Sequence, residues 1–192
     1  MINSYADLDD TAVAVAAARA GADVVRELYG RRLDRVDKGG GDFATTADVE
    51  AEKAILGIVR AARPGDAVLG EESGRQGSAE AARQWLVDPL CGTLNYAVGN
   101  MLVAVNVALR DGAAAVADPF AGEVFLTDGT TAWVRPKDGP DTRLEPPPPP
   151  GWSTSTWTRP SRTPPDSGPS TRSRTPGSPS GSGRAWCPRR WR

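Results

Sequence analysis

The chain has 192 residues, a formal net charge of −1 and no histidine. Its length suits one domain that is large enough to bury a hydrophobic core. The lack of histidine excludes Ser-His-Asp and Cys-His catalysis, phosphohistidine intermediates and zinc bound through imidazole. Any hydrolytic chemistry must therefore rest on carboxylates, hydroxyls, backbone amides or metal ions.

The amino-terminal segment MINSYADLDD lacks the basic stretch followed by an apolar stretch that marks a signal peptide. No apolar run approaches the roughly 20 residues that span a bilayer. Cys91 and Cys187 lie far apart and show no paired spacing. These features predict a cytoplasmic protein with reduced thiols and no membrane contact.

A long first helix is predicted near the amino terminus. Asn3 or Ser4 can cap it, and the Ala/Val-rich stretch that follows extends to about Leu33, with Gly30 near its end. Acidic residues near its start favour the positive end of the helix dipole. These are Asp7, Asp9 and Asp10, and the expected buried positions are Leu8, Val15, Val25 and Leu28.

A short extended piece and a second helix follow. Arg35 to Lys38 is predicted to be extended, and the glycines at 39–41 to form a flexible loop. Thr45 or Thr46 then caps a helix that runs to about Ala62 and is closed by the Arg-Pro-Gly at 63–65. Its apolar stretch is Ile55, Leu56, Ile58 and Val59.

Beyond residue 66 the pattern changes to short apolar runs that are typical of strands. These runs are 67–70, 85–87, 102–109, 113–117, 123–126 and 131–134. The Asp-Gly pairs at 111–112 and 128–129 predict tight hairpin turns. Two helices followed by a strand meander indicate an α+β or layered α/β/α arrangement.

Residues 146–192 differ sharply from the rest of the chain. They hold eight Arg, one acidic residue, twelve of the seventeen Pro and no Ile, Leu, Val, Met, Phe or Tyr. A segment that buries so little aliphatic surface is predicted to be disordered, which leaves residues 1–145 as the domain. Three interpretations of this segment are open. Residues 146–150 can be a polyproline spacer, and the rest can be a basic tail that binds nucleic acid or anionic membranes. Alternatively, the whole segment is the product of translation in a wrong reading frame. We favour the last, which would leave the domain truncated or frameshifted after about residue 145.

Three acidic positions stand out in the predicted domain. Glu71-Glu72 and Asp88 each come directly after a predicted strand, where sheet proteins gather ligand sites, and Asp48 lies in the first turn of the second helix. Acids brought to one place repel unless a cation joins them, and Mg²⁺ prefers oxygen ligands. Each has a simpler interpretation, as a helix start, a solvated loop or a turn, so the hypothesis depends on the three together.

The segment Asp88–Tyr96, DPLCGTLNY, places a Gly-Thr pair just after a strand, where backbone N–H groups can hold a phosphate. It resembles the Asp-Pro-Ile/Leu-Asp-Gly-Thr-x-Asn-Phe/Tyr signature of the inositol monophosphatase family. The segment DFATTAD at 42–48 is similar to that family's Asp-x-x-Thr-x-x-Asp segment, and GEES at 70–73 matches its Gly-Glu-Glu-Ser element. The resemblance covers roughly residues 5–145.

The resemblance implies Mg²⁺-dependent hydrolysis of a small phosphate monoester, such as inositol monophosphate. It also implies a layered α/β/α sugar-phosphatase fold, of which this chain would hold the N-terminal portion, commonly as a homodimer. The partners expected are a small phosphorylated metabolite and a second copy of the chain.

The family's site residues carry over by position. Glu71, Asp88 and the Leu90 carbonyl would hold the first Mg²⁺, and Asp88 would also bridge to a second. Glu71 and Thr93 would orient the attacking water, with Asp48 accepting a hydrogen bond from the Thr93 hydroxyl. The phosphate would lie on the amides of Gly92 and Thr93, within the substrate-binding segment that also holds Leu90 and Cys91, and Lys38 would lie near the family's mobile active-site loop.

Two departures put full activity in question. Cys91 stands where the family has an aspartate that binds the second Mg²⁺, and the family's later Trp-Asp-x-Ala-Ala-Gly motif does not occur. A thiol is a soft ligand that Mg²⁺ disfavours, so the second metal site is predicted to be weak or empty. Without histidine, we expect Cys91 to be a small buried hydrophobe and not a nucleophile.

Three hypotheses therefore remain: an active magnesium phosphatase, a catalytically impaired or inactive relative, and a nucleic-acid-binding protein that uses its basic tail. The acidic composition of residues 1–145 argues against the third.

Overall fold

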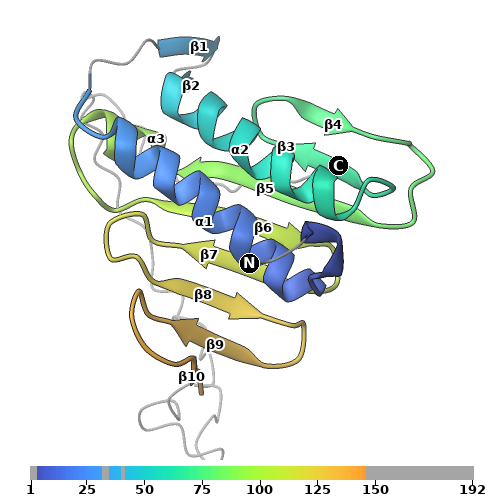
Figure 1. Cartoon of the computed structure of the whole chain (residues 1–192). Coiled ribbons are helices and arrows are strands. Elements are labelled where there is room, and N and C mark those ends of the chain that lie inside the picture. Colours follow the sequence, from blue (N-terminus) through green and yellow to red (C-terminus); the bar gives the residue numbers. More distant parts are fainter. Residues whose placement is uncertain (1–3, 32–34, 40–41, 146–192) are drawn as a thin grey trace, which may run out of the picture. The chain divides into compact units, whose positions relative to one another are not determined.

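Two long helices lie side by side on one face of an eight-stranded sheet in the computed structural model (Figure 1). The structure describes residues 4–31, 35–39 and 42–145. The fold is therefore mixed α+β, as predicted. The tail predicted for residues 146–192 and most of the loop predicted at 39–41 lie outside the described residues.

The first helix begins later and ends earlier than predicted. Ser4 caps only a 3-10 turn, Tyr5–Asp7, and the helix α1 (Asp10–Leu28) begins separately, with the Asp9 carboxylate accepting the Ala12 N–H at 2.7 Å. Each cap starts its own helical segment, so the single helix predicted from residue 3 or 4 is wrong. The helix stops before Gly30, whose φ of +74° is left-handed.

The second helix is the one that was predicted. It follows a hairpin of β1 (Arg35–Gly39) and β2 (Asp42–Thr45), and α2 (Thr46–Ala62) begins at the Thr45 cap. Its buried side includes Ile55 and Val59, and it packs against α1 and β5. None of the helices in the described part of the chain is long and apolar enough to cross a membrane.

The sheet contains all six predicted strands. Its order is β10-β9-β8-β7-β6-β5-β3-β4, and every neighbouring pair is antiparallel except β3 and β5. The short strands β2, β4 and β10 were not predicted. The strands of this sheet are β3 (Ala67–Gly70), β4 (Gly74–Gln76), β5 (Gln84–Cys91), β6 (Ala104–Leu109), β7 (Ala114–Ala117), β8 (Val124–Thr127), β9 (Ala132–Arg135) and β10 (Thr142–Arg143).

The sequence predicted that this strand ends at Val87, but β5 continues to Cys91. Asp88 pairs with Asn106 and Cys91 with Ala104, so β5 holds one residue more than β6 across this step. Such a bulge tolerates Pro89, which has no N–H to offer the neighbouring strand. Asp88 therefore lies at a bulge within an interior strand and not at a strand end.

The core fills the space between the helices and the sheet. Val13 and Val25 of α1, Ile55 of α2 and Trp85 of β5 are fully buried there. Their burial on one face of the sheet stabilises the layer by roughly 1.5–3 kcal/mol for each large side chain. The core thereby fixes α2 against β5, which is the contact that positions the candidate site.

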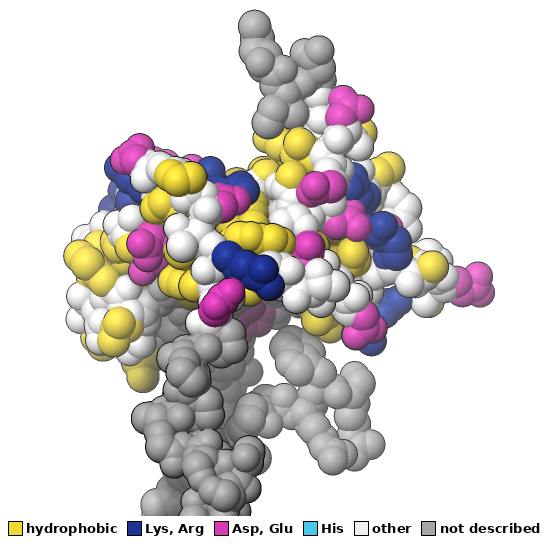
Figure 2. Space-filling model, turned by 90° about the horizontal axis from the view of Figure 1, so that it is seen from below, with side chains coloured by type: hydrophobic (Ala, Val, Ile, Leu, Met, Phe, Trp, Pro, Cys, Tyr) yellow, Lys and Arg dark blue, Asp and Glu magenta, His cyan; other side chains and the backbone are white. Residues whose placement is uncertain are grey.

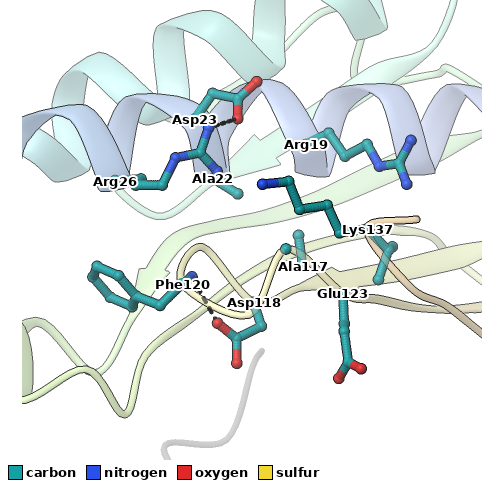
Figure 3. A pocket seen from close by; sticks show the side chains of 11 residues that line it. Arg19, Ala22, Asp23, Arg26, Ala117, Asp118, Phe120, Glu123 and Lys137 are labelled. Atoms are coloured by element: carbon teal, nitrogen blue, oxygen red, sulfur yellow. Dashed lines mark hydrogen bonds and ion pairs between the residues drawn. The ribbon is translucent and has the colours of Figure 1, made fainter.

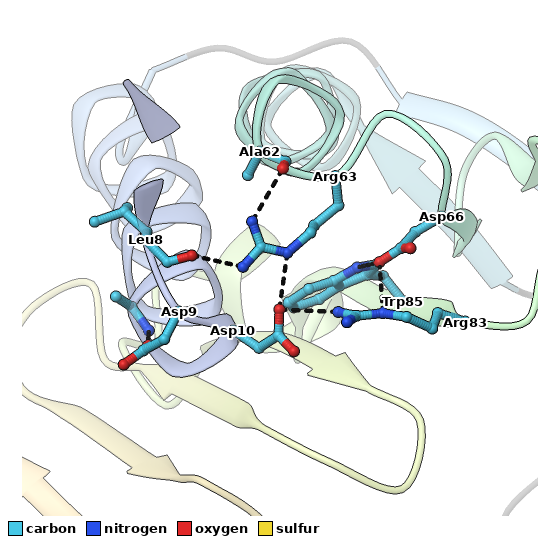
Figure 4. A network of polar contacts seen from close by, with 9 residues as sticks. Leu8, Asp9, Asp10, Ala62, Arg63, Asp66, Arg83 and Trp85 are labelled. Atoms are coloured by element: carbon cyan, nitrogen blue, oxygen red, sulfur yellow. Dashed lines mark hydrogen bonds and ion pairs between the residues drawn. The ribbon is translucent and has the colours of Figure 1, made fainter. Parts of the chain in front are cut away.

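A polar network joins the start of α1 to the end of α2 and to β5 (Figure 4). Arg63 Nε donates to Asp10 Oδ1 at 2.8 Å, and Arg83 pairs with the same oxygen at 2.8 Å. Asp66 accepts from Trp85 Nε1 at 2.8 Å and also pairs with Arg83. The network closes the end of the core beneath the two helices.

Candidate functional site

The parallel pair β3 and β5 brings two of the predicted carboxylates together. Gly70 pairs with Val87, so Glu71 and Asp88 follow at the same level of adjacent strands. The backbone N–H of Glu71 donates to the Val87 carbonyl at 3.1 Å, and the Glu71 side chain lies close enough to Asp88 to influence the pKa of that carboxyl group. Adjacent carboxyl groups of this kind are a typical starting point for a cation site.

Asp88 carries one buried oxygen that lacks a partner. Asp88 Oδ2 accepts from Asn106 Nδ2 at 3.4 Å, whereas Oδ1 is buried and makes no hydrogen bond. Burial raises the pKa of Asp88, and hydrogen bonds from Glu71, Asn106 and Cys91 oppose that rise. A buried carboxylate oxygen left without a donor is costly unless a cation or a proton satisfies it.

Cys91 is exposed, so the expectation of a small buried hydrophobe is wrong. It is the last residue of β5 and follows the bulge, after which the alternation of buried positions along the strand is broken. Partial desolvation raises the pKa of the Cys91 thiol, and the negative charge of Asp88 raises it further. The thiol therefore stays protonated at neutral pH, and a thiolate nucleophile is disfavoured.

Asp48 connects α2 to the turn after β5. It is 1% exposed, and its Oδ2 accepts the backbone N–H of Thr45 at 2.7 Å and the Thr45 hydroxyl at 2.6 Å, which closes a capping box. Its Oδ1 accepts the Thr93 hydroxyl at 2.9 Å. Thr93 Oγ1 also lies 3.1 Å from the Leu90 carbonyl oxygen. The helix start and the candidate phosphate loop are thereby held together.

The turn after Cys91 has a backbone that suits glycine. Gly92 has a φ of +98°, and a Cβ there would lie 3.0 Å from the Leu102 carbonyl oxygen. The short helix α3 (Thr93–Ala97) begins directly after it. Lys38 lies in β1, and its side chain is outside the described part of the structure.

Two site residues were not predicted from the sequence. Asn106 of β6 donates to Asp88 across the sheet, and only the strand register identifies it. Glu52 of α2 is 2% exposed and accepts the backbone N–H groups of Glu72 and Ser73. A signal for Glu52 existed, because it lies one helical turn from Asp48 and falls on the buried side of α2.

The residues present fit one hard cation. An unpartnered buried oxygen of Asp88, the adjacent Glu71 carboxyl group and the Leu90 carbonyl supply oxygen ligands, which Mg²⁺ prefers. Among the described residues, no group of three or more Cys, Asp and Glu side chains is arranged to hold a metal ion.

A separate hollow of about 380 Å³ lies between α1 and the β7–β8 turn (Figure 3). Charges of both signs line it: Arg26 is paired with Asp23, and the Lys137 side chain extends into the hollow. Asp118 accepts the N–H groups of Phe120 and Ala121, so its carboxylate stabilises the turn. No predicted site residue lines this hollow.

The surface seen in Figure 2 carries acidic and basic side chains interspersed with hydrophobic ones. Nucleic-acid-binding faces instead gather Lys and Arg into one patch or stripe. This face of the described residues therefore lends no support to a nucleic-acid interface.

The model of the inositol monophosphatase family matches residues 7–155. The chain is similar to the inositol-1-monophosphatase of Caulobacter vibrioides, with 36% identity over 121 residues that cover 59% of this chain and 47% of the relative. It is also similar to the Nus factor SuhB of Haemophilus influenzae, with 32% identity over 119 residues that cover 59% and 45%. The chain thus spans about half the length of the relatives that it matches.

Solved structures show the same fold. The extragenic suppressor protein SuhB of Bartonella henselae matches with a TM-score of 0.61 and 31% identity, over 65% of this chain and 51% of that one. The IMPase of Thermotoga maritima matches with a TM-score of 0.59 and 22% identity, over 67% and 52%. The sheet with its two covering helices is therefore shared with both proteins.

Proposed function

The chain belongs to the inositol monophosphatase family, and we propose that its site is that of an Mg²⁺-dependent phosphatase for a small phosphate monoester such as inositol monophosphate. The observation that carries the proposal is the unpartnered buried oxygen of Asp88 beside the Glu71 carboxyl group. Relatives named inositol-1-monophosphatase support the reaction class.

Glu71, Asp88 and the Leu90 carbonyl are the proposed ligands of the ion. A bound Mg²⁺ would supply Lewis-acid activation of a water molecule and neutralise charge on the phosphate. The protein contributes the parallel strand pair, which holds the two carboxyl groups at one level. Asn106 holds Asp88 from the neighbouring strand and so limits how its carboxylate turns.

Thr93 and Asp48 are proposed to orient the attacking water together with Glu71. The Thr93 hydroxyl donates to Asp48 at 2.9 Å, which leaves its oxygen lone pairs available to accept a hydrogen bond. Asp48 is fixed in turn by the Thr45 cap. The amides of Gly92 and Thr93, where α3 begins, are the proposed contacts for phosphate oxygens.

Cys91 limits the proposed activity. It lies beside Asp88, where the family has an aspartate, and its protonated thiol is a poor ligand for Mg²⁺. We therefore propose that a second ion binds weakly or not at all, and that turnover is low. The alternative is a relative that binds one cation without catalysis.

Phosphate release from inositol-1-phosphate tests the proposal, with and without Mg²⁺. We expect slow release that requires Mg²⁺ and that falls by at least tenfold in Asp88→Asn and Glu71→Gln, because each removes a charged ligand. Asp118→Asn is the control, since that carboxylate caps a turn on another strand pair. Release that survives a chelator or the Asp88→Asn change contradicts the proposed mechanism.

A calorimetric titration with Mg²⁺ separates the two alternatives. Binding without phosphate release supports the inactive relative. If the chain neither binds Mg²⁺ nor releases phosphate, both the active phosphatase and the cation-binding relative are refuted.

A further inference from the structure

We propose that Glu52 is a positioning residue, whose buried carboxylate fixes the turn that carries Glu71. The inference rests on the proposed function, because it assigns Glu71 a place among the cation ligands. It concerns a side chain of α2 that accepts hydrogen bonds from backbone groups of the turn.

The contacts of Glu52 are two successive backbone amides. Glu52 Oε2 accepts the N–H of Glu72 at 2.8 Å, and Oε1 accepts the N–H of Ser73 at 2.9 Å. Hydrogen bonds to a carboxylate are roughly twice as strong as those between neutral groups. With Glu71 N–H held by the Val87 carbonyl, three amides in a row have fixed acceptors.

The space around the carboxylate leaves Glu52 little freedom to move. The side chain is 2% exposed, and a Cβ added to Gly70 would lie 2.7 Å from Glu52 Cδ and from both carboxylate oxygens. The glycine thus allows the strand end to approach the carboxylate closely. A buried charged group in such a place is tolerated only when it is hydrogen-bonded, as this one is.

The buried side of helix α2 therefore contacts both loops of the site. Asp48 accepts from Thr93 in the turn after β5, and Glu52, one helical turn later, accepts from the turn after β3. Because both carboxylates stand on one rigid helix, the distance between the two loops is fixed by α2. Glu52 acts on the cation through Glu71 and not by contact with it.

The test is the Mg²⁺ affinity of Glu52→Gln, measured by calorimetry on the full chain. The amide offers one oxygen, so one of the two N–H groups loses its acceptor and meets an NH₂ group. We expect about tenfold weaker Mg²⁺ binding, in the range found when residues behind metal ligands are changed. Glu52→Asp keeps the charge but shortens the side chain, and we expect it to weaken binding as well.

Asp118→Asn is the matched control. Asp118 Oδ1 also accepts two successive backbone N–H groups, from Phe120 and Ala121 at 2.8 and 2.9 Å, but in the β7–β8 turn. We expect it to lower the thermal midpoint without changing Mg²⁺ affinity. Glu52→Gln with wild-type affinity, or Asp118→Asn with an equal loss of affinity, overturns the proposal.

Amide hydrogen exchange on the unmodified protein covers the case in which the Glu52 variants do not fold. Ser73 is exposed, so its N–H would exchange quickly without the Glu52 carboxylate. We expect the Glu72 and Ser73 amides to be protected at least tenfold relative to an unstructured chain, and exchange at the unstructured rate overturns the proposal. If the wild-type chain binds no Mg²⁺, the proposed function fails and this inference with it. Unchanged affinity in Glu52→Gln defeats the inference alone.

Discussion

At position 91 a thiol stands beside two carboxyl groups. Desolvation and the charges of Asp88 and then Glu71 raise the pKa of Cys91, whereas Asn106 opposes that rise. The thiol is therefore neutral and soft, whereas the other proposed ligands of the ion are hard oxygens. We propose that this one residue limits how many divalent ions the site can hold.

Cys91→Asp is expected to tighten Mg²⁺ binding by about tenfold, because a carboxylate replaces a neutral thiol among oxygen ligands. The effect is measured by calorimetric titration of the full chain. Cys91→Asn is the control, since it has the shape of aspartate without the charge. Equal affinity for the wild type and Cys91→Asp would show that position 91 does not face the ion.

The sequence allowed some of these residues to be predicted and not others. Glu71 and Asp88 could be found because short apolar runs predicted two strands, and the parallel pairing then brought the acids together. The burial of Glu52 depends on Gly70, which is distant in sequence and lets the carboxylate lie against the strand end. The exposure of Cys91 follows from the bulge in β5, which no local sequence pattern predicted.

At the scale of elements, α3 is fastened to α1 by an aromatic cluster. The Tyr96 hydroxyl donates to the Val25 carbonyl at 2.7 Å, and Tyr29 donates to the Gly99 carbonyl. The rings of Tyr29 and Tyr96 meet edge to face at 5.4 Å between centroids. Val25 lies in the last turn of α1, where carbonyls lack helical partners, so Tyr96 supplies one.

Tyr96→Phe is expected to lower the free energy of unfolding by about 1 kcal/mol, because a buried carbonyl loses its donor. Burial, and then the charge of Asp48, raises the pKa of Tyr96 to about 12. The neutral hydroxyl is thus favoured by the folded state, and its contribution is complete below the ordinary value of 10.0 and is lost as the pH rises toward 12. Urea unfolding at pH 7 to 11 should show less alkaline destabilisation in the variant than in the wild type. If the free energy of unfolding falls equally with rising pH in the variant and in the wild type, the proposed role of the Tyr96 hydroxyl is contradicted.

The network around Asp10 joins α1, α2 and β5 at the other end of the core. Burial alone would raise the pKa of Asp10, but hydrogen bonds from Arg83 and then Arg63 lower it below the ordinary 3.8. The ionised form is therefore favoured by folding. Its contribution is complete above pH 3.8 and is lost as the pH falls through the lower pKa of the folded state.

Asp10→Asn is expected to cost about 1–2 kcal/mol at pH 7, since two arginines lose their shared partner while water screens part of the loss. The difference from the wild type should shrink below pH 3.8, where Asp10 becomes protonated. Urea unfolding at several pH values measures it. Asp7→Asn, a change in the preceding 3-10 turn, serves as a control with little expected effect. If the difference in the free energy of unfolding between Asp10→Asn and the wild type stays the same at acid pH, the ionised Asp10 carboxylate is not its source.

The elements themselves were largely predictable, because periodic apolar runs and strong caps determine them. The α2 cap at Thr45 and the Asp-Gly turns are local signals that the structure reproduces. The strands β4 and β10 were missed because each has three residues or fewer and forms only through pairing with a neighbour. The start of α1 was misplaced because Ser4 caps a separate 3-10 turn, and Asp9, five residues later, caps the α-helix.

At the scale of the whole described region, apolar surface gathers next to the candidate site. Four large apolar side chains of α3 and the segment after it are each more than half exposed: Leu94 at 64%, Val98 at 70%, Met101 at 54% and Leu102 at 75%. A second apolar area lies on the sheet, where Val116 of β7 and Phe125 of β8 are paired neighbours. Soluble monomers rarely leave several large side chains so exposed in one place.

We predict that the segment 94–102 drives association between copies of this chain, because it is the more exposed of the two apolar areas. Leu94→Ser combined with Leu102→Glu should shift the sedimentation coefficient toward the monomer at micromolar protein, since a charge would have to be buried. Val116→Thr combined with Phe125→Thr is the comparison, because it removes apolar area from the sheet while keeping residues that favour strands. If the sheet variant dissociates and the α3 variant does not, the contact lies on the sheet. Salt distinguishes the mechanism further, because apolar association persists at high ionic strength whereas association through surface charges weakens.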